Sequence, residues 1–128
     1  SGVKIFDGDL KDFELADYLV KTSVLSLIKG TSNSGAVVLY DTATAKGCRV
    51  TVVSKSSTGK KSMVEYNVID NGTDIFHNEF GSLNTSADGF EASFDITPSN
   101  ETRITLTLSD DHAINDTVEI TVLTQVVK

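Results

Sequence analysis

The stretch FEASFDIT, residues 90–97, decides the fold, because apolar and polar side chains alternate along it without a break. The apolar residues are Phe90, Ala92, Phe94 and Ile96, and every residue between them is polar. A period of two is typical of a β-strand that has one face against a core and the other in water. The same alternation returns at residues 104–108 and 118–122. Strands of this kind, placed so close together, predict an antiparallel sheet.

The sequence before residue 90 predicts further strands at short intervals. They cover residues 36–41, 48–54, 63–70 and 73–80, with one or two more before residue 30. Asn71-Gly72 separates two apolar runs and predicts a two-residue type I′ turn, which would pair residues 63–70 with 73–80. Regular strands with tight turns indicate an all-β protein: an antiparallel β-sandwich with jelly-roll-like connections and about eight strands.

Length and charge limit the classes of protein to consider. The 128 residues suffice for one folded domain, and the net charge of −7 argues against nucleic acid as a partner. The charge is unevenly distributed: residues 1–17 carry −3, residues 18–61 carry +6 and residues 62–128 carry −10. Such segregation either forms one mixed surface in the fold or leaves patches that pair between subunits. No stretch is long and apolar enough to predict a membrane span, so we expect no membrane partner.

The first 30 residues differ from the rest, and we treat 1–30 as an N-terminal arm with the first strand and 31–128 as the β-sandwich domain. Leu10, Phe13, Ala16 and Val20 stand near helical spacing, and Asp9 could cap a helix. A short helix and an extended arm are both consistent with this pattern. Residues 18–28 are rich in aliphatic and β-branched residues and predict a strand.

No group of residues in the sequence predicts catalysis or cofactor binding. The acidic stretch that begins at Asp7 fails the EF-hand register, because Asp12 stands where the turn needs glycine. Cys48 lies in an apolar run and is expected to be a small core residue. His77 and His112 have no metal-ligand spacing with Cys48 or with each other. We therefore expect no catalytic, cofactor-binding or metal-binding residues, and a protein that is not an enzyme.

The order of several short motifs, from Cys48 to Val127, resembles a β-domain of virion structural proteins from tailed marine and cyanobacterial bacteriophages. The motifs are, in order, RVTVVSKS, EYNVIDNGT, HNEFG, FEASFDIT, TRITLTLS and NDTVEITVL. In that family the aromatic-Gly step is usually Tyr-Gly, whereas this chain has Phe80-Gly81. The resemblance covers about 60% of the chain and implies a non-enzymatic virion component, made in the host cytoplasm, of the capsid decoration or fibre type.

Together these observations favour a capsid decoration (cement) protein that binds the outer head surface. The expected partners are the major capsid protein or another virion protein, and copies of the chain itself in a homo-oligomer, for which a trimer is one option. The alternative is a recognition module, associated with a tail or head fibre, that binds host surface glycan. We expect the interface to use apolar anchors in the arm and a positively charged hairpin tip: Phe6, Leu10, Phe13, Tyr18, Lys55, Lys60 and Lys61.

Overall fold

The computed structural model describes residues 12–15, 17–85 and 89–128, and for residues 12–15 it describes the backbone only. This part of the chain forms nine strands: β1 (Asp12–Leu15), β2 (Tyr18–Ile28), β3 (Ser34–Asp41), β4 (Gly47–Ser56), β5 (Lys61–Asp70), β6 (Ile75–Asn84), β7 (Phe90–Ile96), β8 (Glu101–Leu108) and β9 (Thr117–Val127). The described residues contain no helix, so residues 12–15 follow the extended alternative.

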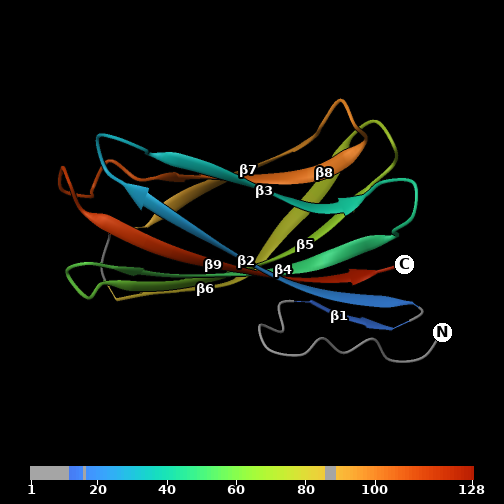
Figure 1. Ribbon diagram of the computed structural model, residues 1–128, viewed down its shortest axis with the longest axis horizontal. Helices are drawn as coiled ribbons and strands as arrows, with labels where there is room; N and C mark the ends of the chain where they lie inside the picture. Colours follow the sequence, from blue (N-terminus) through green and yellow to red (C-terminus); the bar gives the residue numbers. More distant parts are fainter. Residues whose placement is uncertain (1–11, 16, 86–88) are drawn as a thin grey trace.

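The strands form two antiparallel sheets that pack face to face (Figure 1). The larger sheet has the order β1-β2-β9-β4-β5-β6, and the smaller sheet has the order β3-β8-β7. Four connections cross between the sheets, from β2 to β3, β3 to β4, β6 to β7 and β8 to β9, while β4, β5 and β6 form a meander within the larger sheet. The predicted antiparallel β-sandwich is therefore confirmed.

Strand β2, expected within the first 30 residues, is part of the sandwich. It pairs with β9 along its whole length, from Tyr18 opposite Val127 to Ile28 opposite Thr117. Leu27 is buried in the core, and Leu19 and Leu25 pack against it. The β-branched and aliphatic residues of this segment thus form a paired and partly buried strand, as their β propensity predicts.

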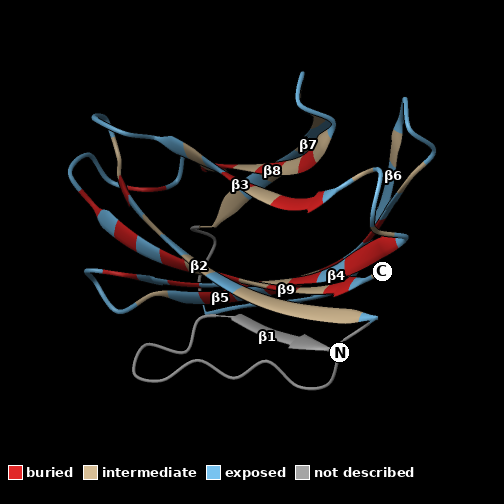
Figure 2. Cartoon of the chain, turned by 45° about the vertical axis from the view of Figure 1, so that its right-hand side comes forward, coloured by how far each residue is buried: buried red, intermediate tan, exposed pale blue. Residues whose placement is uncertain are grey.

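The core lies between the sheets and is built from the alternating residues that point inward (Figure 2). On β8, Ile104 and Leu106 have no exposed surface, and on β9 the same holds for Ile120 and Val122. Cys48 is also buried, and burial raises the pKa of its thiol to about 12. It is therefore a core residue with an inert thiol, as predicted.

Two side chains connect the sheets through polar contacts. The Tyr40 hydroxyl on β3 donates a hydrogen bond of 2.7 Å to Oδ1 of Asp70, at the end of β5. From β2, the Lys21 ammonium donates across the sandwich to the backbone carbonyl oxygen of Val38, 3.3 Å away. Both contacts satisfy polar groups that would otherwise be unpaired between the sheets.

The pairing of β5 with β6 is confirmed, but the turn between them is not the predicted two-residue type. The last pair is Asp70 with Ile75, which leaves a four-residue loop. The Asn71 side chain closes this loop by accepting hydrogen bonds from the backbone N–H groups of Thr73 and Asp74. Gly72 has a φ of 91°, so the expected positive φ occurs at the glycine alone and not at Asn71.

Candidate functional site

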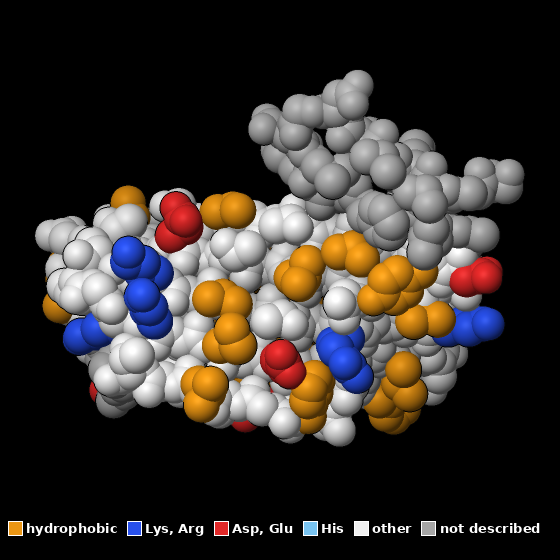
Figure 3. Space-filling view, turned by 90° about the horizontal axis from the view of Figure 1, so that it is seen from below, with side chains coloured by type: hydrophobic (Ala, Val, Ile, Leu, Met, Phe, Trp, Pro, Cys, Tyr) orange, Lys and Arg blue, Asp and Glu red, His pale blue; other side chains and the backbone are white. Residues whose placement is uncertain are grey.

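The outer face of the larger sheet carries exposed apolar side chains, which is unusual for a sheet surface in contact with water. Figure 3 shows hydrophobic side chains spread across this face, with Lys or Arg and Asp or Glu side chains between and beside them. Eight large apolar residues are exposed here by alternation along their strands: Val24, Val53, Met63, Ile69, Phe76, Phe80, Leu83 and Val127. Exposed apolar patches of this kind mark binding surfaces more often than scattered single residues do.

Strand register arranges these side chains into rows that run across the sheet. One row, which we call the apolar row, is formed by directly opposed residues from five strands: Val24, Thr121, Val53, Met63 and Leu83. Leu83 is 72% exposed and Val24 is 60% exposed. A hollow of about 410 Å³ lies at the Val53–Met63–Leu83 end of this row. The row therefore offers an apolar contact surface that is interrupted by the hydroxyl-bearing side chain of Thr121.

Two of the predicted lysines lie beside the apolar row. Lys55 on β4 and Lys61 on β5 are directly opposed in the register, and both are exposed. On its other side Lys55 is directly opposed to Glu119 on β9, so Lys55 stands between a second ammonium group and a carboxylate. Lys60 differs: it is half-buried in the turn, where its charge helps to lower the pKa of Asp116.

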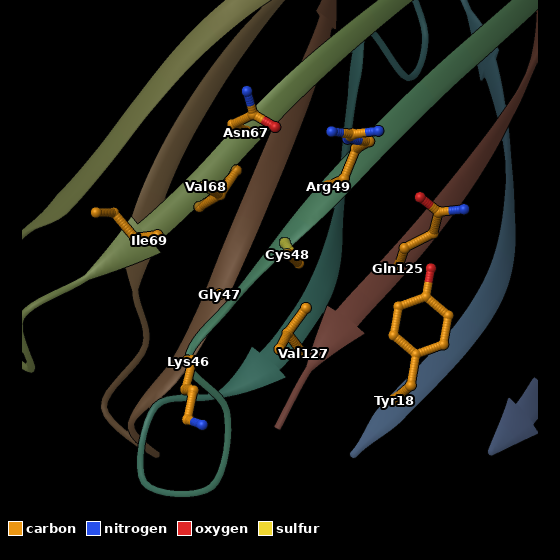
Figure 4. Close-up of a pocket in the computed structure, with 10 residues that line it drawn as sticks. All are labelled: Tyr18, Lys46, Gly47, Cys48, Arg49, Asn67, Val68, Ile69, Gln125 and Val127. Carbon is orange, nitrogen blue, oxygen red and sulfur yellow. The ribbon is translucent and has the colours of Figure 1, made fainter. Parts of the chain in front are cut away.

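At the opposite end of the same face, two neighbouring rows form a groove. The first row contains Tyr18, Val127, Gly47, Ile69 and Phe76, and the second contains Val20, Gln125, Arg49, Asn67 and Asn78. A hollow of about 430 Å³ lies over Gly47, between Tyr18 and Ile69. A second hollow of about 310 Å³ continues past Ile69 to Phe76. Figure 4 shows Arg49 between Asn67 and Gln125 on adjacent strands, with Tyr18 pointing toward Gln125.

Gly47 creates the depth of the groove. A Cβ atom at this position would lie 2.8 Å from the carbonyl oxygen of Val68 and 2.9 Å from Cγ2 of Ile69, which is closer than atoms can pack. Only glycine therefore fits here. The missing side chain leaves a gap between Val127 and Ile69 in the first of the two rows that form the groove, and that gap is the floor of the groove.

A cluster of Ser57, His112 and Asp116 has the residue types of a catalytic triad but not its geometry. Ser57 Oγ donates to Asp116 Oδ1 at 2.9 Å and makes no contact with the histidine. Nδ1 of His112 lies 3.0 Å from Asp116 Oδ2, and Nε2 lies 2.8 Å from the carbonyl oxygen of Gly89. A carbonyl oxygen only accepts, so Nε2 carries a hydrogen and cannot act as a base toward a serine.

This cluster is better described as a structural clasp. His112 and Asp116 are both buried, and their bond is the largest cause of a pKa for Asp116 below the ordinary range. Asp116 accepts a hydrogen bond from Ser57 in the β4–β5 hairpin, and His112 donates one to Gly89, the residue before β7. It therefore joins the two sheets at one end of the sandwich.

The remaining predicted site residues fall as follows. Tyr18, on β2, lies in the groove beside Gly47, the first residue of β4. The lysine hairpin is at the other end of β4, roughly 30 Å away at a rise of about 3.3 Å per residue, so the structure does not bring these groups together. Phe6 and Leu10 lie outside the described residues, and for Phe13 only the strand backbone is described. His77 is exposed, and its ring centroid lies 4.3 Å from that of Phe94 on β7. The exposed apolar residues of β5 and β6 were missed by the sequence analysis.

Within residues 12–15, 17–85 and 89–128, no group of three or more His, Cys, Asp or Glu side chains is placed to hold a metal ion. The same residues include no helix that is long and apolar enough to cross a membrane.

No protein-family model matches this chain, and no curated protein matches it. Among solved structures, the tailspike protein of the Acinetobacter phage vB_ApiP_P1 is similar to 84% of this chain, with 13% sequence identity and a TM-score of 0.48. The chain spans only 22% of the length of that tailspike chain. A similarity this distant does not extend to function.

Proposed function

We propose that this protein is a non-enzymatic structural component of a phage virion, and specifically a capsid decoration protein that binds the outer head surface through the larger sheet. The observation that carries the proposal is the apolar row with two opposed lysines beside it. Burying exposed apolar area contributes about 25 cal/mol per Å², so the side chains that five strands contribute to this row can attach the protein to a partner without a covalent bond.

The charge beside the row indicates the kind of partner surface. Lys55 and Lys61 are directly opposed across the β4–β5 pair, with Glu119 on the other side of Lys55, and an acidic group on the partner would offer Lys61 an opposite charge. We therefore expect the virion partner, the major capsid protein or another head protein, to present an apolar strip bordered by carboxylates. The order of short motifs from Cys48 to Val127, which resembles that of phage virion structural proteins, supports the assignment to a virion component.

The test is a sedimentation assay with phage heads that lack the protein. We expect the wild-type protein to pellet with heads in saturable amounts, and the double variant Met63→Gln/Leu83→Gln to lose at least about tenfold in affinity. A matched control, Ser93→Gln/Thr107→Gln, changes the outer face of the smaller sheet and should bind like the wild type.

Two results would contradict the proposal. If the Met63→Gln/Leu83→Gln variant pellets like the wild type, the apolar row is not the attachment surface. If heads capture no protein while tails or host cells do, the decoration role is wrong and the recognition module becomes the better assignment.

A further inference from the structure

We propose that the groove over Gly47 is a binding site for an acidic saccharide, a short sugar chain that carries carboxylate groups. This inference does not depend on the decoration role, because the groove lies at the other end of the face from the lysine hairpin and can be tested on the isolated protein.

The first argument is the set of polar groups that the fold leaves unused around the groove. Among the described residues, the side chains of Lys46, Arg49, Asn67 and Gln125 have no hydrogen-bond or ion-pair partner. All four line the same hollow, and Asn67, Arg49 and Gln125 are directly opposed across three adjacent strands. Two amides and two cations around one hollow can bind a ligand that has both hydroxyl and carboxylate groups.

Arg49 is held in position for such a ligand. Its guanidinium carbon lies 5.1 Å from the centroid of the Phe80 ring, which is a cation–π contact. Phe80 can make this contact because it is the extra residue of a β-bulge in β6, opposite the step from Glu65 to Tyr66. A cation–π contact uses none of the guanidinium N–H groups as hydrogen-bond donors to a carboxylate or carbonyl, so they stay available to a ligand carboxylate.

The second argument is the shape of the groove and its apolar surfaces. Tyr18 stands at one end, Phe76 stands at the other, and Ile69 lies between the two hollows. From β2 to β6 there are four strand spacings, or about 19 Å, so the groove has room for a short oligosaccharide. Aromatic rings offer flat apolar surfaces to the C–H faces of sugar rings, while the polar row runs along one side.

The position of the groove favours a saccharide over a peptide. The hollow over Gly47 lies across β2, β9, β4 and β5, whose backbone groups are already paired with neighbouring strands. A peptide that binds a sheet commonly adds a strand at a free edge, and the middle of a sheet face offers no such edge. Recognition here must use side chains alone, and the side chains that line the hollow are two amides, two cations, one aromatic ring and several aliphatic groups.

The experiment is titration of the full chain, followed by backbone amide NMR, with a fixed set of probes. The acidic probes are an α-1,4-linked oligogalacturonate and a hyaluronan tetrasaccharide. The neutral probe is a maltotetraose, and the peptide probe is a tetraglutamate. We expect saturable shifts for at least one acidic saccharide, centred on Gly47, Arg49, Asn67 and Gln125, and binding that weakens as salt is raised.

Two variants separate the groove from the rest of the surface. Arg49→Gln removes the charge and should weaken binding by about tenfold or more. Arg103→Gln removes a cation from the smaller sheet and should leave the affinity unchanged. An amide spectrum that stays dispersed in both variants confirms that they are folded.

Each other outcome overturns part or all of the inference. Equal affinity for maltotetraose would show that carboxylates are not recognised. Binding of tetraglutamate in the groove, with no saccharide bound, would reassign the site to an acidic peptide. The absence of saturable shifts with both acidic saccharides at millimolar concentration would rule the site out. None of these results bears on capture by phage heads, so this inference and the decoration role can fail separately.

Discussion

The outer faces of the two sheets were built from the same alternating pattern, yet they differ in chemistry. The smaller sheet presents short polar and charged groups to water, such as Ser93, Asp95, Arg103, Thr105 and Thr107. The larger sheet presents eight large apolar side chains on its outer face. A fold needs only one apolar face per sheet to form its core. The second apolar face of the larger sheet is therefore not needed to form this core, which is consistent with the binding role proposed for it.

The largest loss of stability is expected when the clasp that holds the two sheets together at one end is broken. Asp116→Ala leaves His112 buried without its carboxylate partner, and we expect a loss of roughly 3–5 kcal/mol in the free energy of unfolding. Chemical denaturation at pH 7 measures the loss. Asp111→Ala, an exposed neighbour, is the control and should change little.

The clasp also makes a pH dependence predictable. Hydrogen bonding to His112 lowers the pKa of Asp116 below its unfolded value of about 3.9. The ionised carboxylate therefore stabilises the fold above about pH 4, and this contribution is lost as the pH falls through the folded pKa. The free energy of unfolding, measured from pH 6 to pH 2, should fall less steeply with decreasing pH for Asp116→Ala than for the wild type. Parallel curves would show that another carboxylate controls acid unfolding.

An intermediate effect is expected from two neighbouring residues of β4 that face opposite sides. Val52 has no exposed surface and Val53 is 38% exposed. We expect Val52→Ala to cost roughly 2–3 kcal/mol in stability, because it leaves a cavity in the core. Val53→Ala should cost no more than about 0.5 kcal/mol in stability, because the Val53 side chain lies in the apolar row on the outer face and not in the core. Thermal unfolding of the two variants checks the difference, and equal losses would mean that the outer face is also part of the folding core.

The smallest effect is expected at the loop that leads into β6, the strand that carries Phe76 and Leu83. Gly72 has a positive φ, which a β-branched residue adopts poorly, so Gly72→Val should cost about 1–2 kcal/mol. Gly81→Val, within β6 and with open space around it, is the control. Denaturant midpoints of both variants test the loop, and a midpoint for Gly72→Val as high as the control would contradict the assigned conformation.

Much of the fold could be predicted from the sequence because alternation reports which side chains a strand buries. The alternating run 90–97 matches β7 to within a residue, and the runs 104–108 and 118–122 lie inside β8 and β9. The β5–β6 loop was wrong because Asn71-Gly72 also suits a four-residue loop, in which the Asn71 side chain accepts the backbone hydrogen bonds. Strand pairing between distant segments, such as β2 with β9, has no local signal.

The candidate site was predicted less well, although part of its signal was present. Apolar residues stand side by side at Val52-Val53, Met63-Val64, Val68-Ile69 and Val126-Val127. In a strand such neighbours point to opposite faces, so one of each pair had to face outward. The groove had no such signal, because Arg49, Asn67 and Gln125 meet only through the register of three strands. The proposed anchors Phe6 and Leu10 stay predictions.

The meeting of the two ends of the sandwich has a practical consequence for protein engineering. The backbone N–H of Lys128 donates to the carbonyl oxygen of Asp17, and Tyr18 is paired with Val127. Because Val127 also borders the groove, an affinity tag fused directly after Lys128 would sit beside it. A tag at that position should therefore be removed before the groove is screened for ligands.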